Sequence, residues 1–458
     1  DPTGNGAAML TGATGAVLNL ANANLVEHIT IGSAVDGIGA LNITDATIDG
    51  VGFDSLTGFA FNFDSIAGTV TLSDLGFTAT AGLLNVANTS ASIDAASVNF
   101  SATGSAQAAV AIDGQTGGAI TLGSLTSDTG TAANVFSSTN QTGGSVSVQG
   151  LTVTGYNNNA GTAVNLSGSG SVSFTGLNLT ATDGNGLSAG AVTLDIGAGS
   201  GITASSGQAL NLQNTVLATG GITLDTVSST GSASQGIVLS GVGGGDLTIT
   251  SATVDSSTGN SMDLSGLTSN LTVSGATITN SLASGIVLNA NTGDVTFGDT
   301  NITTTGDDGI ALTGTHGTIG FGNIDVTSAT DAAVDFSGFD GTFTAASLDV
   351  NGGLTGIDLT NAQGTITFTN GGVMQNFTDS GVHFSETDDP VDSADANFVF
   401  GGGSITATGS AYVLDGVGLD PAKGLYNFTG VTFNGDFNFA PGAGQVGELF
   451  FVAANATG

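Results

Sequence analysis

The sequence predicts an all-β fold, a right-handed parallel β-helix with three short strands in each coil of about 24 residues. Three observations predict it: apolar residues that alternate with Thr, Ser and Asn, a short glycine-led motif that recurs along the chain, and a nearly constant spacing between its copies. Such alternation is typical of strands, in which successive side chains point to opposite faces. No segment shows a sustained helical period, and Gly and Thr, both poor helix formers, are abundant.

The recurring motif is Gly-x-(Val/Ile/Leu)-Thr-(Phe/Leu), as at residues 293–297 and 364–368. In the most regular region its glycines stand at 293, 317, 341 and 364, so the spacings are 24, 24 and 23 residues. A second motif, Gly-Ile-Val-Leu at 285–288, keeps this period, and a third short run lies between the two. Three inward faces per period form a tube with a core of Ile, Val, Leu and Phe. The crossover rule for parallel strands makes the tube right-handed.

The organisation of the 458 residues follows from counting these copies. Roughly sixteen coils lie between Val17 and Leu414. We therefore expect an N-terminal end segment at 1–16, the β-helix at 17–425 and a C-terminal edge segment at 426–458. The chain opens with Asp1-Pro2 rather than Met, so we interpret it as a processed or excised mature segment.

The charge balance excludes several classes of partner. The chain has 37 acidic residues and one basic residue, Lys423, which gives a formal net charge of −36. Nucleic acids and anionic membranes are bound through Lys and Arg, so we expect neither as a partner. With no cysteine, the chain has no disulfide and no thiolate metal site. No apolar run is long enough for a membrane span.

In coil pattern and composition, nearly the whole chain resembles the β-helical passengers of bacterial autotransporters and large repetitive adhesins. The resemblance implies a right-handed parallel β-helix that is exported, lies at the bacterial cell surface and binds cells, matrices or other copies of itself. The calcium-binding Gly-Gly-x-Gly-x-Asp array is absent, because residues 243–246 hold only a fragment of it.

The same fold occurs in pectate lyases and polygalacturonases, so a catalytic site has to be considered. The lyases depend on arginine or lysine, and this chain has only Lys423. Residues 306–309, Gly-Asp-Asp-Gly, and 315–317, Thr-His-Gly, are similar to polygalacturonase motifs, and paired carboxylates suit inverting hydrolysis. That family places another Asp one coil earlier, where this chain has Ala283 and Ser284, and its Arg-x-Lys clamp is missing. We therefore interpret Asp307 and Asp308 as turn residues and expect no enzyme activity.

Two further sets of polar residues are predicted to lie on the surface. His28, His316 and His383 have no metal-ligand spacing, so we expect isolated surface histidines. The outward position of the second motif is expected to form a polar column, either an amide ladder or a surface that binds glycans or a partner's edge. Its members are Asn19, Asn62, Asn85, Asn134, Asn165, Asn211, Asp263, Asp335 and Asp358.

One acidic segment, residues 385–397, is a candidate calcium site, because carboxylate oxygens are the ligands that calcium prefers. The alternative is a solvated acidic loop, since the spacing is not that of an EF-hand. Calcium is the only cofactor that we consider. The proposed ligands are Glu386, Asp388, Asp389, Asp392 and Asp395.

Two functions lead, and a third is retained. The first is a secreted, non-catalytic adhesin or passenger-type structural solenoid, whose partners would be surface glycans or other cell-surface proteins. The second is a subunit of an extracellular filament or surface layer that binds its own copies head-to-tail, because the apolar segments at 7–18 and 446–453 lack the polar caps of a solenoid. The third is a polysaccharide-processing enzyme, for which fold is the main argument.

Overall fold

The computed structural model confirms the predicted fold class: an all-β parallel β-solenoid of about 17 coils, where roughly sixteen were predicted. The chain divides into two compact units, Asp1–Ser229 and Thr230–Gly458, each described by itself below. The structure describes residues 9–12, 14–78, 80–102, 107–127, 131–385, 396–417 and 425–440.

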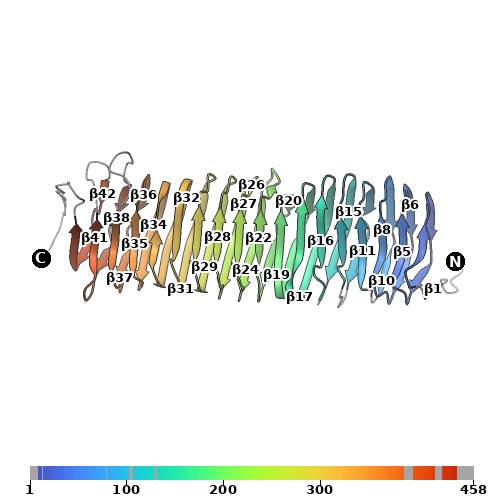
Figure 1. Cartoon of the computed structure of the whole chain (residues 1–458), viewed down its shortest axis with the longest axis horizontal. Helices are drawn as coiled ribbons and strands as arrows, with labels where there is room; N and C mark the ends of the chain where they lie inside the picture. Colours follow the sequence, from blue (N-terminus) through green and yellow to red (C-terminus); the bar gives the residue numbers. More distant parts are fainter. Residues whose placement is uncertain are drawn as a thin grey trace. The chain divides into compact units, whose positions relative to one another are not determined.

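Unit 1 contains three columns of parallel strands (Figure 1). Column A carries the second motif and consists of β2 (Ala16–Leu20), β5 (Asp36–Leu41), β8 (Phe59–Asp64), β11 (Gly82–Ala87), β14 (Val110–Asp113), β16 (Phe136–Gln141), β17 (Ser145–Gly168), β19 (Leu177–Gly190) and β22 (Leu210–Gln213). Column B carries the first motif and consists of β3 (Asn24–Glu27), β6 (Asp45–Asp49), β9 (Thr69–Ser73), β12 (Ser92–Ala95), β15 (Ala119–Ser127), part of β17, β18 (Ser171–Phe174), β20 (Thr193–Ile196) and β23 (Val216–Leu217).

The remaining strands of unit 1 form column C, to which β15, β17 and β19 also contribute by continuing around a corner. Four of its members make a separate sheet, and the others belong to the large one. Column C consists of β1 (Met9–Thr11), β4 (Thr30–Gly32), β7 (Gly52–Asp54), β10 (Gly76–Thr78), β13 (Phe100–Ala102), β21 (Ser200–Ala204) and β24 (Ile222–Thr230).

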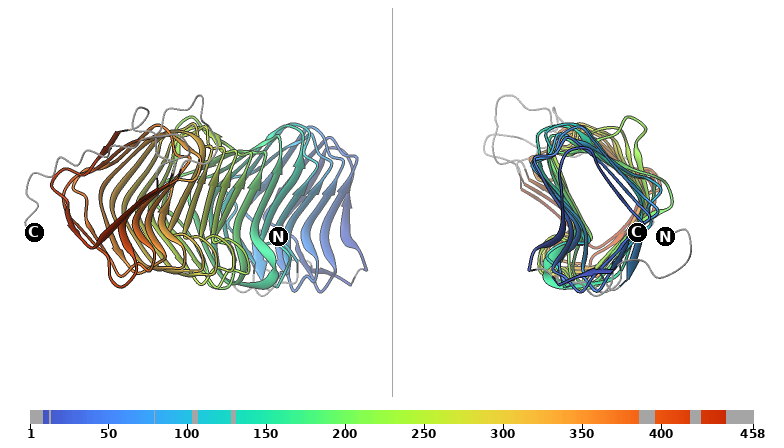
Figure 2. Two further views of the ribbon diagram at one scale, coloured as in Figure 1. Left: turned by 60° about the vertical axis from the view of Figure 1, so that its left-hand side comes forward. Right: turned by 90° about the vertical axis from the view of Figure 1, so that its right-hand side faces the viewer.

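Unit 2 repeats this arrangement, and Figure 2 (left) shows its coils, coloured yellow to red, stacked in parallel. Its column A consists of β25 (Ile237–Ser240), β28 (Met262–Ser265), β30 (Ile286–Asn289), β32 (Ile310–Ala329), β33 (Ala332–Asp335), β35 (Thr355–Thr360), β38 (Ser380–Ser385), β41 (Tyr412–Val417) and β44 (Asp436–Ala440).

Columns B and C of unit 2 share several long strands that turn a corner. Both include β27 (Leu247–Asp255), β29 (Leu271–Ser281), β31 (Val295–Thr305), β32 and β34 (Phe339–Asn351). Column B ends with β36 (Thr365–Phe368), β39 (Asn397–Phe400) and β42 (Leu425–Asn427), column C ends with β37 (Val373–Gln375), β40 (Ser404–Thr406) and β43 (Thr432–Asn434), and a short β26 (Gly243–Gly244) precedes β27.

The core of each unit is a stack of inward side chains that meet their equivalents one coil away. In unit 2, Phe297 stacks on Phe321 with ring centroids 4.7 Å apart and an interplanar angle of 5°. In unit 1, Phe53 stacks on Phe77 at 5.5 Å. Because the strands pair in parallel and in register, like residues lie above like residues, and offset aromatic stacks of this kind stabilise the core beyond simple burial.

The leading glycine of the first motif is required by the neighbouring coil. At Gly364 the φ angle is +82°, and an added Cβ atom would lie 2.1 Å from the carbonyl oxygen of Gly341. Gly293 faces the same obstacle, with the carbonyl oxygen of Ser269 at 2.2 Å from such an atom. The recurrence of glycine, from which the coil length was predicted, therefore reflects close backbone approach at one corner.

The in-and-out assignment of the first motif can be tested with two neighbouring substitutions. Phe297 is 1% exposed, whereas Thr296 is exposed. We expect Phe297→Ala to lower the free energy of unfolding of unit 2 by about 3–5 kcal/mol, because it removes a buried ring and leaves a cavity. Thr296→Ala should change it by less than about 0.5 kcal/mol. Urea unfolding measures both, and equal effects would contradict the assignment.

Candidate functional site

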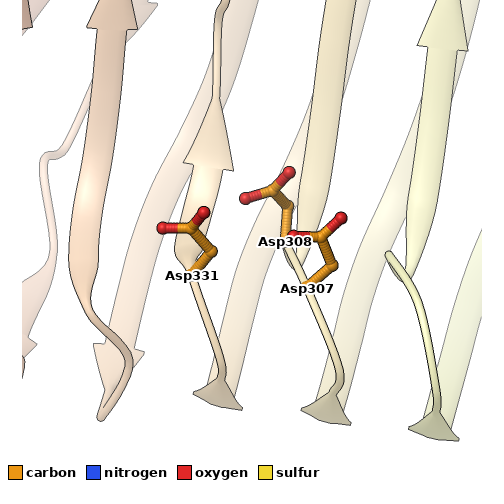
Figure 3. A group of neighbouring side chains, drawn as sticks. All are labelled: Asp307, Asp308 and Asp331. Atoms are coloured by element: carbon orange, nitrogen blue, oxygen red, sulfur yellow. The ribbon is translucent and has the colours of Figure 1, made fainter.

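Three carboxylates meet on two successive turns of unit 2, an arrangement that we name the acidic corner (Figure 3). Asp307 and Asp308 lie on the turn before β32, and Asp331 lies on the turn before β33. One oxygen atom from each of the three side chains lies within 4.8 Å of the others. Asp307 and Asp331 are separated by 24 positions, which is one coil.

Backbone hydrogen bonds between coils hold the turns of the acidic corner in place. The carbonyl oxygen of Asp308 accepts the N–H of Gly285 from the preceding coil at 2.9 Å. The carbonyl oxygen of Asp307 accepts the N–H of Asp331 from the following coil at 3.4 Å, and the Thr305 hydroxyl from its own turn at 2.8 Å. The same register that stacks the turns therefore brings their acidic side chains together.

The electrostatics of the acidic corner favour protonation. Asp308 is 9% exposed, and burial, followed by the nearby Asp335 charge, raises its pKa to about 7. Burial and the neighbouring Asp307 charge also raise the pKa of Asp331. Asp335, on β33, has its pKa raised to about 7 by burial and then by Asp358, and its Oδ1 atom is buried without a hydrogen-bond partner. Four carboxyl groups thus share a region in which not all of them ionise together at neutral pH.

Two kinds of chemistry are open to this arrangement. Carboxylate oxygens at such separations suit a hard cation such as calcium. A protonated carboxyl beside an ionised one is also the pattern of acid–base catalysis. However, the Oδ1 atom of Asp308 already accepts the N–H of Ala332 at 3.1 Å. The polygalacturonase resemblance requires an aspartate one coil earlier, but that place is taken by Ser284. The hydroxyl of Ser284 lies 3.4 Å from Oδ2 of Asp307.

The sequence placed Asp307 and Asp308 correctly on a turn, but it did not connect them with Asp331. The available signal was the spacing of 24 residues, which is the coil length and puts Asp331 directly above Asp307. The predicted calcium ligands Glu386, Asp388, Asp389, Asp392 and Asp395 lie outside the described residues, so that calcium site stays a prediction.

The prediction of surface histidines was wrong for His316, which is 8% exposed. This residue lies at the corner that follows the second motif, and its side chain points inward. Its ring stacks on that of Phe339, with the ring centroids 5.4 Å apart. Its Nδ1 accepts the N–H of Asn291 at 3.3 Å, so Nε2 carries the proton and donates to the Thr313 carbonyl oxygen at 2.9 Å. Burial lowers the pKa of His316, which keeps the ring neutral.

The other two histidines lie away from the core. His383 occupies an outward position on β38 and is half-buried, with Nδ1 at 3.2 Å from Oδ1 of Asp358. His28 is exposed and lies on a turn with a φ angle of +52°. Among the residues that the structure describes, the His383–Asp358 contact is the only one that joins a basic and an acidic side chain, and it is an ion pair only when His383 is protonated.

The predicted polar column is confirmed as an amide ladder between Asn62 and Asn85, where Nδ2 of Asn85 donates to Oδ1 of Asn62 at 2.9 Å. The assignment of Asn134 to the column was wrong, because Ser137 is the residue aligned with Asn165. Asn134 stands between the apolar residues Ala133 and Val135, so it has the pattern of an outward strand position although it precedes the strand. The strand starts at Phe136, and its second inward position holds Ser138, a polar residue that alternation does not predict.

Comparison with known proteins finds no matching family model, no matching curated protein and no matching solved structure. The resemblance to autotransporter passengers therefore rests on the coil pattern and composition. In the part of the chain that the structure describes, no helix has the length and apolar character needed to cross a membrane.

The coupling within the acidic corner predicts a pH-dependent stability. A carboxyl whose pKa rises from 3.8 to about 7 on folding stabilises the fold fully below pH 3.8, and this stabilisation is lost as the pH rises through 7. Asp308→Asn keeps the acceptor for the Ala332 N–H and removes the charge. We expect it to raise the free energy of unfolding at pH 8 by roughly 2–4 kcal/mol and by progressively less towards pH 5.

The matched control for this measurement is Asp294→Asn. Asp294 is exposed and makes the equivalent bond, from Oδ1 to the N–H of Thr318, at 3.1 Å. Urea unfolding of both variants between pH 5 and pH 8 checks the prediction. A gain for Asp308→Asn that does not depend on pH would show that ionisation of this side chain does not oppose folding.

A second prediction separates specific cation binding from screening. With a net charge of −36, the folded chain should be stabilised by any salt, and calcium should stabilise it more than sodium if carboxylates bind it. Thermal unfolding in sodium chloride and calcium chloride at equal ionic strength measures the difference. If the acidic corner binds calcium, the double variant Asp307→Asn with Asp331→Asn should abolish the difference between the two salts. If the acidic segment at 385–397 binds it, the double variant Asp388→Asn with Asp392→Asn should abolish the difference instead. Coincident melting curves for the wild type would exclude both sites as determinants of folding.

Proposed function

We propose that this chain is a non-catalytic structural β-solenoid of the bacterial cell surface, working as an adhesin or passenger-type module. The proposal depends on one observation: the carboxylates tie successive coils together. In each case the side chain of an Asp accepts a backbone N–H from the next coil; Asp294 and Asp308 lie on turns, and the other four lie within strands. The pairs are Asp36 with Phe59, Asp45 with Thr69, Asp294 with Thr318, Asp299 with Asn323, Asp308 with Ala332 and Asp349 with Val373.

Asp308 belongs to this series, which argues against a catalytic role. Its bond to the Ala332 N–H at 3.1 Å has the same length and partner type as the bond between Asp294 and Thr318. A general acid or base needs a free oxygen near the reacting group, and the Asp308 oxygen that faces the next coil is occupied. The absence of arginine also removes the usual bidentate ligand for acidic sugars.

Other carboxylates are paired with neutral donors, which explains how the chain tolerates its acidity. Asp255 accepts the hydroxyl of Thr279 at 2.6 Å and the amide of Asn280 at 2.9 Å, and these bonds lower its pKa. Asp49 accepts the hydroxyl of Ser73 at 2.6 Å. The resulting surface consists of hydroxyls, amides and carboxylates in rows, and such a surface suits hydrogen bonding to glycans or to other surface proteins rather than to polyanions.

A head-to-tail filament is the second candidate, favoured by the strands at the ends of the described ladder. Within the described residues, β1 pairs only with β4, and β44 pairs only with β41. Met9 is 50% exposed and Leu10 is 38% exposed on β1. Strand edges with apolar side chains are templates for pairing with another chain, and a heterologous contact of this kind propagates as a fibre.

The proposal predicts binding without turnover. We expect the purified chain to bind glycans or surface proteins in a glycan array or cell-adhesion assay, and Asp307→Asn with Asp308→Asn to leave that binding unchanged, because both side chains have structural roles. Reducing-end and unsaturated-product assays with acidic polysaccharides should show no release of sugar. Light scattering over a range of concentrations should give a constant monomer mass.

Each alternative has its own outcome in these experiments. Release of reducing ends that disappears in the double variant would overturn the proposal in favour of an enzyme. A mass that increases with protein concentration, without turnover, would favour the filament. Failure to bind any glycan or cell surface while the chain stays monomeric would remove the adhesin function.

A further inference from the structure

Column A of unit 2 places a histidine within a row of acidic side chains. The outward positions of β33, β35, β38 and β41 hold Asp335, Asp358, His383 and Asp415, each aligned with the next by strand pairing. The row ends at Asn438 on β44. Neighbouring parallel strands lie about 4.8 Å apart, so each of these groups faces the next at close range. We name this row the Asp–His column.

The contacts within the Asp–His column are uneven. Nδ1 of His383 lies 3.2 Å from Oδ1 of Asp358, an oxygen that also accepts the Thr360 hydroxyl at 2.8 Å. The amide of Asn438 donates to Oδ1 of Asp415 at 2.8 Å. Oδ1 of Asp335, in contrast, is buried and has no hydrogen-bond partner. Asp335 is therefore the member of the column that is least well stabilised when ionised.

The groups that surround the column are acidic as well. They lie on the turns that precede its strands, and the described residues include no Lys or Arg to offset them. His383 is thus the one member of the column that can acquire a positive charge. The acidic groups that act on Asp335 or His383 from these turns are Asp307, Asp308, Asp331 and Asp379.

We propose that the Asp–His column is a proton-operated switch, which tightens the coils of unit 2 from β33 to β41 in mildly acidic surroundings and loosens them at alkaline pH. On acidification the imidazole of His383 gains a proton and becomes a cation between the carboxylates of Asp358 and Asp415. Asp335 gains a proton at its carboxyl group and no longer repels Asp358. On return to alkaline pH both protons leave, and the column holds the adjacent carboxylates of Asp335 and Asp358, and that of Asp415 beyond the neutral His383, without a cation.

The titration of the two groups acts in the same direction. The hydrogen bond with Asp358 raises the pKa of His383, so this group stabilises the fold below its ordinary pKa of 6.5, and the effect is lost as the pH rises through the higher folded value. Burial and then the Asp358 charge raise the pKa of Asp335 to about 7, so its stabilisation is likewise lost as the pH rises through 7. The buried His316 opposes them, because its lowered pKa makes the fold lose stability as the pH falls below 6.5.

Histidine-selective isotope labelling tests the proposal on the full chain, because three histidines give three resolvable imidazole titrations. We expect the His383 titration to lie above pH 6.5 in the wild type and to move to lower pH in Asp358→Asn. The His316 titration should stay where it is, since His316 does not contact Asp358. A His383 titration that is the same in wild type and Asp358→Asn would overturn the proposal.

The link to stability needs a second measurement. The urea midpoint of unit 2 should fall between pH 6 and pH 8 by more in the wild type than in His383→Gln, because glutamine keeps a hydrogen-bonding side chain but does not titrate. Asp335→Asn should raise the midpoint at pH 8 and leave it nearly unchanged below pH 4. Identical pH dependence in the wild type and His383→Gln would show that the histidine operates no switch. Since His316 is retained in both proteins, its opposing effect cancels from the comparison.

Discussion

The structure depends on the parallel, in-register pairing of each coil with the next. Inward side chains, backbone carbonyls and carboxylates find partners one coil away, as Asp308 does with Ala332 and Phe297 with Phe321, both at a separation of 24 residues. A one-residue slip within a strand would turn its inward residues outward, whereas residues added in a turn keep the register, as Asp335, Asp358 and His383 pair although they lie 23 and 25 residues apart. The glycine that leads the first motif is part of this constraint, because the backbone of the preceding coil passes where its side chain would be.

The constraint explains the composition of the surface. Backbone N–H groups need acceptors, and a carboxylate one coil away supplies one at Asp294, Asp299 and Asp349. Neighbouring hydroxyls and amides donate to other carboxylates, as Thr279 and Asn280 do to Asp255. Basic residues are not needed for this role, so these acidic side chains are hydrogen-bonded in a chain with a net charge of −36.

Much of the fold could be predicted because the spacing of the repeated motifs in the sequence equals the length of a coil. Glycine spacing and apolar alternation were sufficient for the parallel β-helix, for the inward position of Phe297 and for the turn at Asp307 and Asp308. What could not be predicted depends on residues that break the local pattern. Ser138 occupies an inward position where alternation predicts an apolar residue, so Asn134 was placed in the wrong column. His316 occupies a corner that accepts side chains as different as Asn291 and Phe339, and its burial depends on backbone partners that sequence does not reveal.

The acidic corner shows why the site was harder to predict than the fold. Asp331 is unremarkable by itself, and only its distance of one coil from Asp307 makes it part of a cluster. The register that gives each carboxylate a donor also aligns carboxylates with one another, as in Asp335 and Asp358. In a repeat, the stacking that pairs a carboxylate with a hydrogen-bond donor also places carboxylates next to one another, because both follow from the same register. Where carboxyl groups lie close together and are buried, burial and then the neighbouring charges raise the pKa, to about 7 for Asp308 and Asp335. A bound proton then takes the place that a basic residue would occupy in another protein. Sensitivity to pH is therefore what we expect of an acidic solenoid whose coils stack in register.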